Sequence, residues 1–222
     1  MSDLFSIAGR EIGPDRPTYL IAELSANHRQ RIETAEELIR AAATAGADAI
    51  KLQTYTADTL TLASHRPEFR IGAGTLWSGR TLHDLYQEAF TPWEWTAPLK
   101  RLAESLGLAL FSTPFDPSAV AYLSSLDVPA YKIASFEIVD LPLIECAARQ
   151  GRPLILSTGM ASLGEIEEAV GVVRRCGAPF ALLHCVSAYP APASEMNLRT
   201  IPHLAAAFAC PTGLSDHTLG IA

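Results

Sequence analysis

The chain has 222 residues, of which 49% are hydrophobic, and its formal net charge is −7. This length and apolar content are sufficient for a globular domain with a buried core. The acidic balance and the lack of a basic run argue against nucleic acid as a partner, because phosphate backbones are bound by clustered Lys and Arg. Small molecules are the expected partners.

The four cysteines are not spaced as CxxC pairs, and each lies in an apolar segment. This pattern favours buried, reduced thiols and, by default, a cytoplasmic location. The first 13 residues do not have the features of a signal peptide, and no apolar run is long enough to span a bilayer. We therefore expect a cytoplasmic protein with no membrane partner.

Seven short apolar runs have the length and composition of buried strands. Segments with helical spacing of apolar residues alternate with them, apart from a long irregular connection over Thr54–Phe90 that holds a short helical segment, Leu82–Ala89. This alternation predicts a parallel sheet. The predicted strands are Tyr19–Leu24, Ala49–Gln53, Leu108–Phe111, Ala130–Ile133, Leu154–Ser157, Phe180–His184 and Thr212–Ser215.

Several predicted helices begin with a capping signal. Thr34–Glu37 and Ser162–Glu165 match the capping box, in which a hydroxyl and a carboxylate satisfy the first backbone N–H groups. Thr91–Glu94 has a similar pattern with proline in the first turn, and Asp116–Pro117 supplies another cap. Gly46 is expected to end the first of these helices.

Two parallel folds are compatible with this alternation. An open, doubly wound sheet would carry a glycine-rich turn such as GxGxxG after the first strand, and none is present. A barrel places its functional residues at the C-terminal ends of its strands, where this sequence repeatedly has polar residues. We therefore predict an α/β fold of the TIM (β/α)8-barrel type. Because seven strands are recognised instead of eight, we expect residues 1–222 to be one incomplete barrel, truncated after strand seven.

Lys51 and Lys132 lie near the ends of two apolar strands. An amino group in such a place costs free energy unless an anion is nearby. Together with the hydroxyls of Thr113, Ser135 and Ser157, the lysines suit a phosphorylated substrate. Two alternatives remain open, namely lysines that reach solvent and a Schiff-base lysine of an aldolase.

Histidines and carboxylates supply further candidates. His217, in the string SDHT, and His28 each follow a strand and are candidate metal ligands or proton carriers, with a structural histidine as the alternative for each. His83 is expected at a surface or loop position. Glu23 and Glu137 suit acid–base chemistry or substrate hydrogen bonds, with surface or capping roles as the alternative.

The strings IAELSANH, IKLQTY, LFSTPFD, YKIASFE, LILSTGMAS, LLHCVSAYP and GLSDHT occur in this order. Together they closely resemble the sialic acid synthase family over nearly the whole chain. The string TLWSGRTLHDLY in the long connection, together with ELSANH, resembles most the branch of the family that makes pseudaminic acid. Synthases of sialic acid itself usually have a motif nearer to EIGINH after the first strand.

The resemblance implies a TIM barrel followed by a small antifreeze-like domain, in a homodimer that exchanges this domain. It implies condensation of phosphoenolpyruvate with the open-chain aldehyde of an N-acetylated amino sugar, with release of phosphate and a divalent metal, Mn²⁺ or Mg²⁺. In the pseudaminic acid branch the sugar is 2,4-diacetamido-2,4,6-trideoxy-L-altrose. An N-acetylneuraminate or legionaminate synthase and an inactive barrel fragment remain alternatives.

The resemblance also implies roles for individual residues. Glu137, Lys51 and Lys132 would be catalytic, and His217 would be one of two metal-binding histidines, the second of which belongs to strand eight. Ser187 stands in a phosphoenolpyruvate-binding segment where the family often has Asn. The other matched contacts of phosphoenolpyruvate are Gln53, Thr113, Ser135, Ser157 and Ser215, and those of the sugar are Glu23, Phe115 and Tyr189.

Overall fold

The structure is a computed structural model that describes residues 4–72 and 78–220. These residues form two compact units. The first unit is Leu20–Asp127, and the second comprises the chain up to Tyr19 together with the chain from Val128. Residues 73–77, within the predicted long connection, and residues 1–3, within the N-terminal segment tested for a signal peptide, lie outside the described part.

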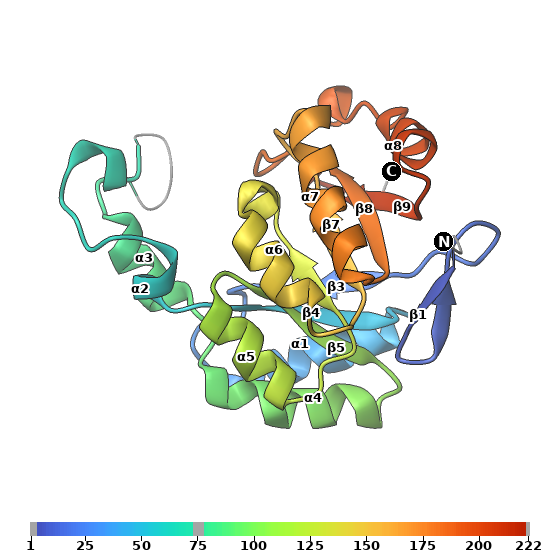
Figure 1. Cartoon of the computed structure of the whole chain (residues 1–222). Helices are drawn as coiled ribbons and strands as arrows, with labels where there is room; N and C mark the ends of the chain where they lie inside the picture. The colour runs from blue at the N-terminus through green and yellow to red at the C-terminus, as the bar shows by residue number, and fades with distance from the viewer. Residues whose placement is uncertain (1–3, 73–77, 221–222) are drawn as a thin grey trace. The chain divides into compact units, whose positions relative to one another are not determined.

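The first unit contains three neighbouring parallel strands with helices packed against them (Figure 1). Helices α1 and α4 contact each other, and their apolar faces bury Ile39 and Leu99 in one core with Ile50 of the sheet. The elements are β3 (Ile21–Glu23), α1 (Ile32–Thr44), β4 (Ala49–Thr54), α2 (Ala57–Leu60), η1 (Pro67–Phe69), α3 (Leu82–Ala89), η2 (Trp93–Trp95), α4 (Thr96–Ser105), β5 (Ala109–Pro114) and α5 (Pro117–Ser125).

The second unit has four neighbouring parallel strands, β6 to β9, and an N-terminal hairpin. The antiparallel hairpin was not predicted, because its two short strands have no strong apolar pattern. The elements are β1 (Phe5–Ile7), β2 (Arg10–Ile12), β6 (Tyr131–Ile133), η3 (Phe136–Val139), α6 (Leu141–Ala148), β7 (Leu154–Ser157), α7 (Leu163–Cys176), β8 (Phe180–Cys185), η4 (Ala193–Glu195), α8 (Thr200–Phe208) and β9 (Thr212–Ser215).

The predicted strands are all present, and two of the capping predictions are wrong. Ser162 and Glu165 form the expected capping box of α7. In contrast, α1 begins at Ile32, so Thr34 lies within the helix and caps nothing. Thr91 does not cap η2 or α4, because its hydroxyl bonds instead to Nε2 of His28 at 3.1 Å.

Two surface expectations also need correction. His83 is buried, with 9% of its surface exposed, and its Nε2 lies 2.8 Å from a carboxylate oxygen of Asp58, so this pair joins α3 to α2. The four cysteines are free thiols, as expected, but Cys146 and Cys176 are partly exposed.

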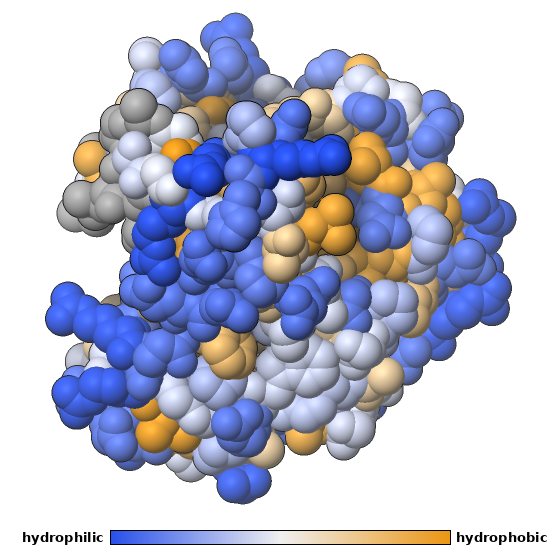
Figure 2. All heavy atoms as spheres, turned by 90° about the vertical axis from the view of Figure 1, so that its left-hand side faces the viewer, coloured by the Kyte–Doolittle hydropathy of each residue, from blue (hydrophilic) through white to orange (hydrophobic). Residues whose placement is uncertain are grey.

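Some large apolar side chains reach the surface of the second unit. Phe136 and Val139 of η3 are more than half exposed, as are Met160 and Leu163 near the start of α7. Figure 2 shows apolar areas among polar ones on one face of the molecule. None of the helices in the described ranges is long and apolar enough to span a bilayer.

The two sequence capping boxes provide a matched test of the structure. Ser162→Ala removes the acceptor of the Glu165 N–H and should lower the free energy of unfolding by about 1 kcal/mol. Thr34→Ala should cause no loss, because alanine has a higher helix propensity than threonine within a helix. Urea unfolding of both variants measures the difference. Equal destabilisation by the two substitutions would contradict the helix boundaries.

Candidate active site

Lys132 is the most deeply buried charged side chain of the predicted site. It lies on β6 with 4% of its surface exposed. Its Nζ donates to the backbone carbonyl of Ile133 at 2.5 Å and to Oγ of Ser157 at 2.6 Å. Burial lowers the pKa of its amino group to about 7, although nearby Cys185 and Glu137 oppose this shift. The ammonium form would therefore gain from an anionic ligand.

Serine hydroxyls at the ends of β6 and β7 add hydrogen-bond donors that favour an anion. Ser157 accepts a hydrogen bond from Lys132, and Ser135 accepts one from the backbone N–H of Gly159 at 3.1 Å. Each serine has an acceptor site occupied by the protein, so its own O–H can donate to a ligand. Such a cluster offers donors, which phosphate and carboxylate oxygens require.

The strand register places further predicted residues on the same side of the sheet. Ser157 pairs with Leu183, which is two residues before Cys185, and Cys185 pairs with Ser215 of β9. Residues two apart on a strand share a face, so Ser157, Cys185 and Ser215 lie on one face. Sγ of Cys185 is 3.8 Å from Oγ of Ser187, which brings Ser187 to the same cluster.

Glu137 follows β6 and belongs to η3. Its Oε2 is buried and has no hydrogen-bond partner among the described residues. Burial raises the pKa of this carboxyl, whereas a backbone hydrogen bond and Lys132 oppose the shift. A carboxyl that holds a proton more readily than usual, near an amine that loses one more readily, is suited to proton transfer.

His217 is held by the segment that follows β8. Its Nδ1 lies 3.0 Å from the carbonyl oxygen of Val186, to which it can only donate, so Nε2 keeps the lone pair. The ring of Tyr189 lies over the imidazole with centroids 4.1 Å apart, and Tyr189 itself is 74% exposed. A backbone carbonyl that fixes the other ring nitrogen is the usual support of a metal-binding histidine.

The described residues supply only part of a metal site. His217 offers one suitable nitrogen, but the described ranges contain no group of three His, Cys, Asp or Glu side chains placed to hold a metal ion. A divalent ion here would therefore take further ligands from water, substrate or other groups.

In the first unit, the predicted substrate residues bond partly to one another. Lys51 of β4 forms an ion pair with Glu23 of β3, its register partner, and the N–H of Ser25 donates to the same carboxylate at 3.1 Å. The lysine is thus compensated by protein, which the sequence analysis did not predict. Gln53 shares a face with Lys51 and pairs in register with Thr113, which is buried.

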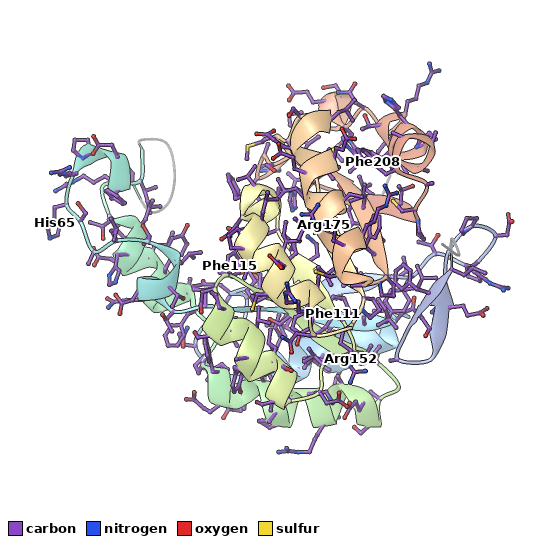
Figure 3. The ribbon with its side chains drawn as sticks, viewed as in Figure 1. His65, Phe111, Phe115, Arg152, Arg175 and Phe208 are labelled. Atoms are coloured by element: carbon purple, nitrogen blue, oxygen red, sulfur yellow. The ribbon has the colours of Figure 1, made fainter. Side chains whose placement is uncertain are left out.

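Two other candidates have clear packing roles. Phe115, labelled in Figure 3, lies just beyond the end of β5. Its ring meets that of Tyr55 edge to face, with centroids 5.5 Å apart. His28 is fully buried, its Nε2 is bonded to Thr91, and its Nδ1 accepts from the N–H of Gln30. Burial lowers the pKa of this histidine. With both ring nitrogens occupied, His28 has a structural role in place of the predicted ligand role.

Gly159, Cys185 and the Val186 carbonyl belong to this cluster but were not predicted from the sequence. Gly159 could have been recognised, because a glycine just after a predicted strand, as in the string STGM, often marks a place where other groups approach the backbone closely. The other two gave no signal, because a cysteine in an apolar strand and a backbone carbonyl look like ordinary core.

The sequence model of the NeuB family matches residues 38–222. The pseudaminic acid synthase of Helicobacter pylori is 48% identical to the chain over 206 residues, which are 92% of the chain and 60% of the relative. The N,N'-diacetyllegionaminic acid synthase of Legionella pneumophila is 37% identical over 94% of the chain and 60% of the relative. The chain therefore spans about 60% of the length of these curated relatives.

A crystal structure of N-acetylneuraminic acid (sialic acid) synthetase from Leptospira borgpetersenii, in complex with citrate, has the same fold. The TM-score is 0.87 at 33% identity, and the match covers 98% of this chain and 71% of that one. This likeness confirms the predicted fold class, an α/β fold of the TIM-barrel type.

The buried amino group of Lys132 makes stability depend on pH. Between pH 7 and about 10.5, the unfolded lysine keeps a proton that the folded one has lost, so its contribution to stability rises with pH. The free energy of unfolding of the wild type, relative to that of Lys132→Met, should therefore rise by up to about 1.4 kcal/mol per pH unit in this window. Urea unfolding from pH 6 to 10 measures this, with Lys100→Met on α4 as control. Parallel curves for wild type and Lys132→Met would contradict the shift.

Proposed function

The chain belongs to the NeuB family, and from this premise we propose that it carries the catalytic barrel of a nonulosonic acid synthase. The proposed reaction condenses phosphoenolpyruvate with an N-acetylated amino sugar and releases phosphate. Within this class we propose pseudaminic acid synthesis from 2,4-diacetamido-2,4,6-trideoxy-L-altrose. The 48% identity to the Helicobacter pylori pseudaminic acid synthase supports this choice of sugar over the legionaminic acid precursor, whose synthase is 37% identical.

The single observation that carries the proposal is the buried amino group of Lys132 among hydroxyl donors. Lys132 and Ser157 bond to each other, and Ser135 has its acceptor side occupied by Gly159. A dianionic phosphate would compensate the ammonium and accept from both hydroxyls. Phosphoenolpyruvate supplies such a phosphate, whereas a neutral sugar would leave the ammonium uncompensated.

The proposed chemistry forms one carbon–carbon bond. The methylene carbon of phosphoenolpyruvate attacks the sugar aldehyde, water adds to the neighbouring carbon, and phosphate leaves by carbon–oxygen cleavage. Lys132 and the serines stabilise the negative charge on the departing phosphate. Glu137, whose carboxyl has a pKa raised by burial and so keeps its proton more readily than an exposed carboxyl, transfers a proton during the addition steps.

A divalent ion, Mn²⁺ or Mg²⁺, would polarise the aldehyde oxygen when bound. Nε2 of His217 would be one of its ligands, since Val186 holds the imidazole in the required tautomer. Tyr189, whose ring contacts the same imidazole at a tilted angle, is also a proposed sugar contact.

In the first unit, Lys51, Gln53 and Thr113 remain proposed contacts for phosphoenolpyruvate, and Glu23 and Phe115 remain proposed sugar contacts. Lys51 would exchange part of its pairing with Glu23 for substrate oxygens. Ser187 and Ser215 are proposed phosphoenolpyruvate contacts of the second unit. The same proposal includes three further points: a homodimeric assembly, an incomplete barrel over residues 1–222 and a cytoplasmic location.

One observation favours a second candidate, an aldolase with Lys132 as Schiff base. A pKa of about 7 leaves much of the Lys132 amine neutral and nucleophilic at physiological pH. Borohydride reduction in the presence of pyruvate distinguishes the two mechanisms. A covalent adduct on Lys132 would support the aldolase, and turnover that depends on metal without an adduct would support the synthase.

The substrate proposal predicts the outcome of a phosphate-release assay. With phosphoenolpyruvate and Mn²⁺, phosphate should appear with the trideoxy-altrose sugar and not with N-acetylmannosamine or without sugar. Release with N-acetylmannosamine would move the proposal to sialic acid synthesis. Binding of phosphoenolpyruvate without release in any mixture would indicate a fragment that binds without turnover.

Substitution of Glu137 tests its proton-transfer role. Glu137→Gln keeps the shape of the side chain but cannot carry the proton, so kcat should fall by about 10²- to 10⁴-fold while binding of phosphoenolpyruvate is kept. Glu145→Gln on α6, where the carboxylate pairs with Arg149, is the matched control and should keep full kcat. Equal kcat values for the two variants would remove Glu137 from the mechanism.

A further inference from the structure

Gly159 lies two residues after the end of β7, in contact with polar groups that follow β6 and β8. A Cβ atom built on Gly159 would lie 2.3 Å from Oγ of Ser187 and 2.9 Å from Oγ of Ser135. It would also lie 3.2 Å from the carbonyl oxygen of Cys185. The hydroxyls of Ser187 and Ser135 therefore occupy space that a side chain at position 159 would need.

The backbone conformation of Gly159 does not explain the glycine. Its φ is not in the left-handed region, so this angle does not by itself require glycine. Gly164, on the first turn of α7, offers the contrast, because its nearest neighbour would be Oγ of Ser162 at 3.9 Å. The need for glycine at position 159 therefore comes from the atoms that surround it, and the two hydroxyls are the nearest of them.

We propose that Gly159 is the positioning residue that shapes this hydroxyl cluster for a phosphate monoester. Its N–H donates to Ser135, and its lack of a side chain lets Ser187 approach the same backbone. The two hydroxyls thus converge, from the segments that follow β6 and β8, on the end of β7, which is the strand that carries Ser157 and its bond to Lys132. This inference rests on the proposed function and assigns the phosphoryl end of the substrate to these groups.

The chemistry of the cluster explains why the converging groups select phosphate. The Oγ of Ser135 already accepts a hydrogen bond from the N–H of Gly159, so the O–H of Ser135 is left to donate. The cluster therefore suits a ligand with several acceptor atoms. A phosphate has several oxygens in a tetrahedral arrangement, so it accepts from hydroxyls that approach from different strands, and Lys132 compensates its charge. A methyl group on residue 159 would push the hydroxyls of Ser135 and Ser187 outward and remove this arrangement.

Calorimetric titration of the folded chain with phosphoenolpyruvate and with inorganic phosphate tests the inference. Gly159→Ala should raise both Kd values by about tenfold or more, because hydrogen bonds to a charged ligand are lost. Gly164→Ala should leave both values unchanged. In turnover assays, KM for phosphoenolpyruvate should rise in Gly159→Ala while KM for the sugar stays the same, a split that general misfolding would not produce.

A double variant shows whether the added methyl acts through the hydroxyl it would touch. Ser187→Ala removes the nearest atom but leaves Ser135 in place, so Gly159→Ala should raise the Kd for phosphoenolpyruvate by a smaller factor in the Ser187→Ala background than in the wild type. Additive losses in the double variant, or wild-type binding by Gly159→Ala, would overturn the inference. A wild-type chain that binds neither phosphoenolpyruvate nor phosphate would instead overturn the proposed function, and the inference with it.

Discussion

The buried amino group of Lys132 is the constraint on which the candidate site depends. A lysine that is 4% exposed must either lose its proton or have its charge compensated. Among the described residues, only a carbonyl and a hydroxyl lie within hydrogen-bond distance of the Lys132 amino group, and neither partner carries a net charge. The result is a pKa of about 7, at which a small electrostatic change decides the charge. An arriving dianion would restore the ammonium form, so binding and protonation would be coupled.

The register of the parallel strands turns this one group into a site. Side chains two apart on neighbouring strands share a face, which places Ser157, Cys185 and Ser215 together. The segments that follow the strands then complete the cluster, with Gly159 bonded to Ser135 and Val186 holding the imidazole of His217. These contacts are made largely by backbone groups, so they depend on the fold more than on individual side chains.

The sequence predicted the strands well, because buried parallel strands are continuous apolar runs with little ambiguity. It predicted caps less well, since Ser162 and Thr34 have the same local pattern and tertiary packing decides which one starts a helix. The polar ends of the strands revealed the candidate residues, but not their partners. The ion pair of Lys51 with Glu23 and the close approach at Gly159 are three-dimensional facts that spacing along the chain does not contain.

The most direct test of the account is the proton balance of phosphoenolpyruvate binding at pH 8. Calorimetry in two buffers of different ionisation enthalpy measures it, and the phosphate is already fully ionised at this pH. If the ligand occupies the Lys132 cluster, the wild type should take up about one proton per molecule bound, and Lys132→Met should take up none. Binding by the wild type without proton uptake would show that the phosphate lies elsewhere.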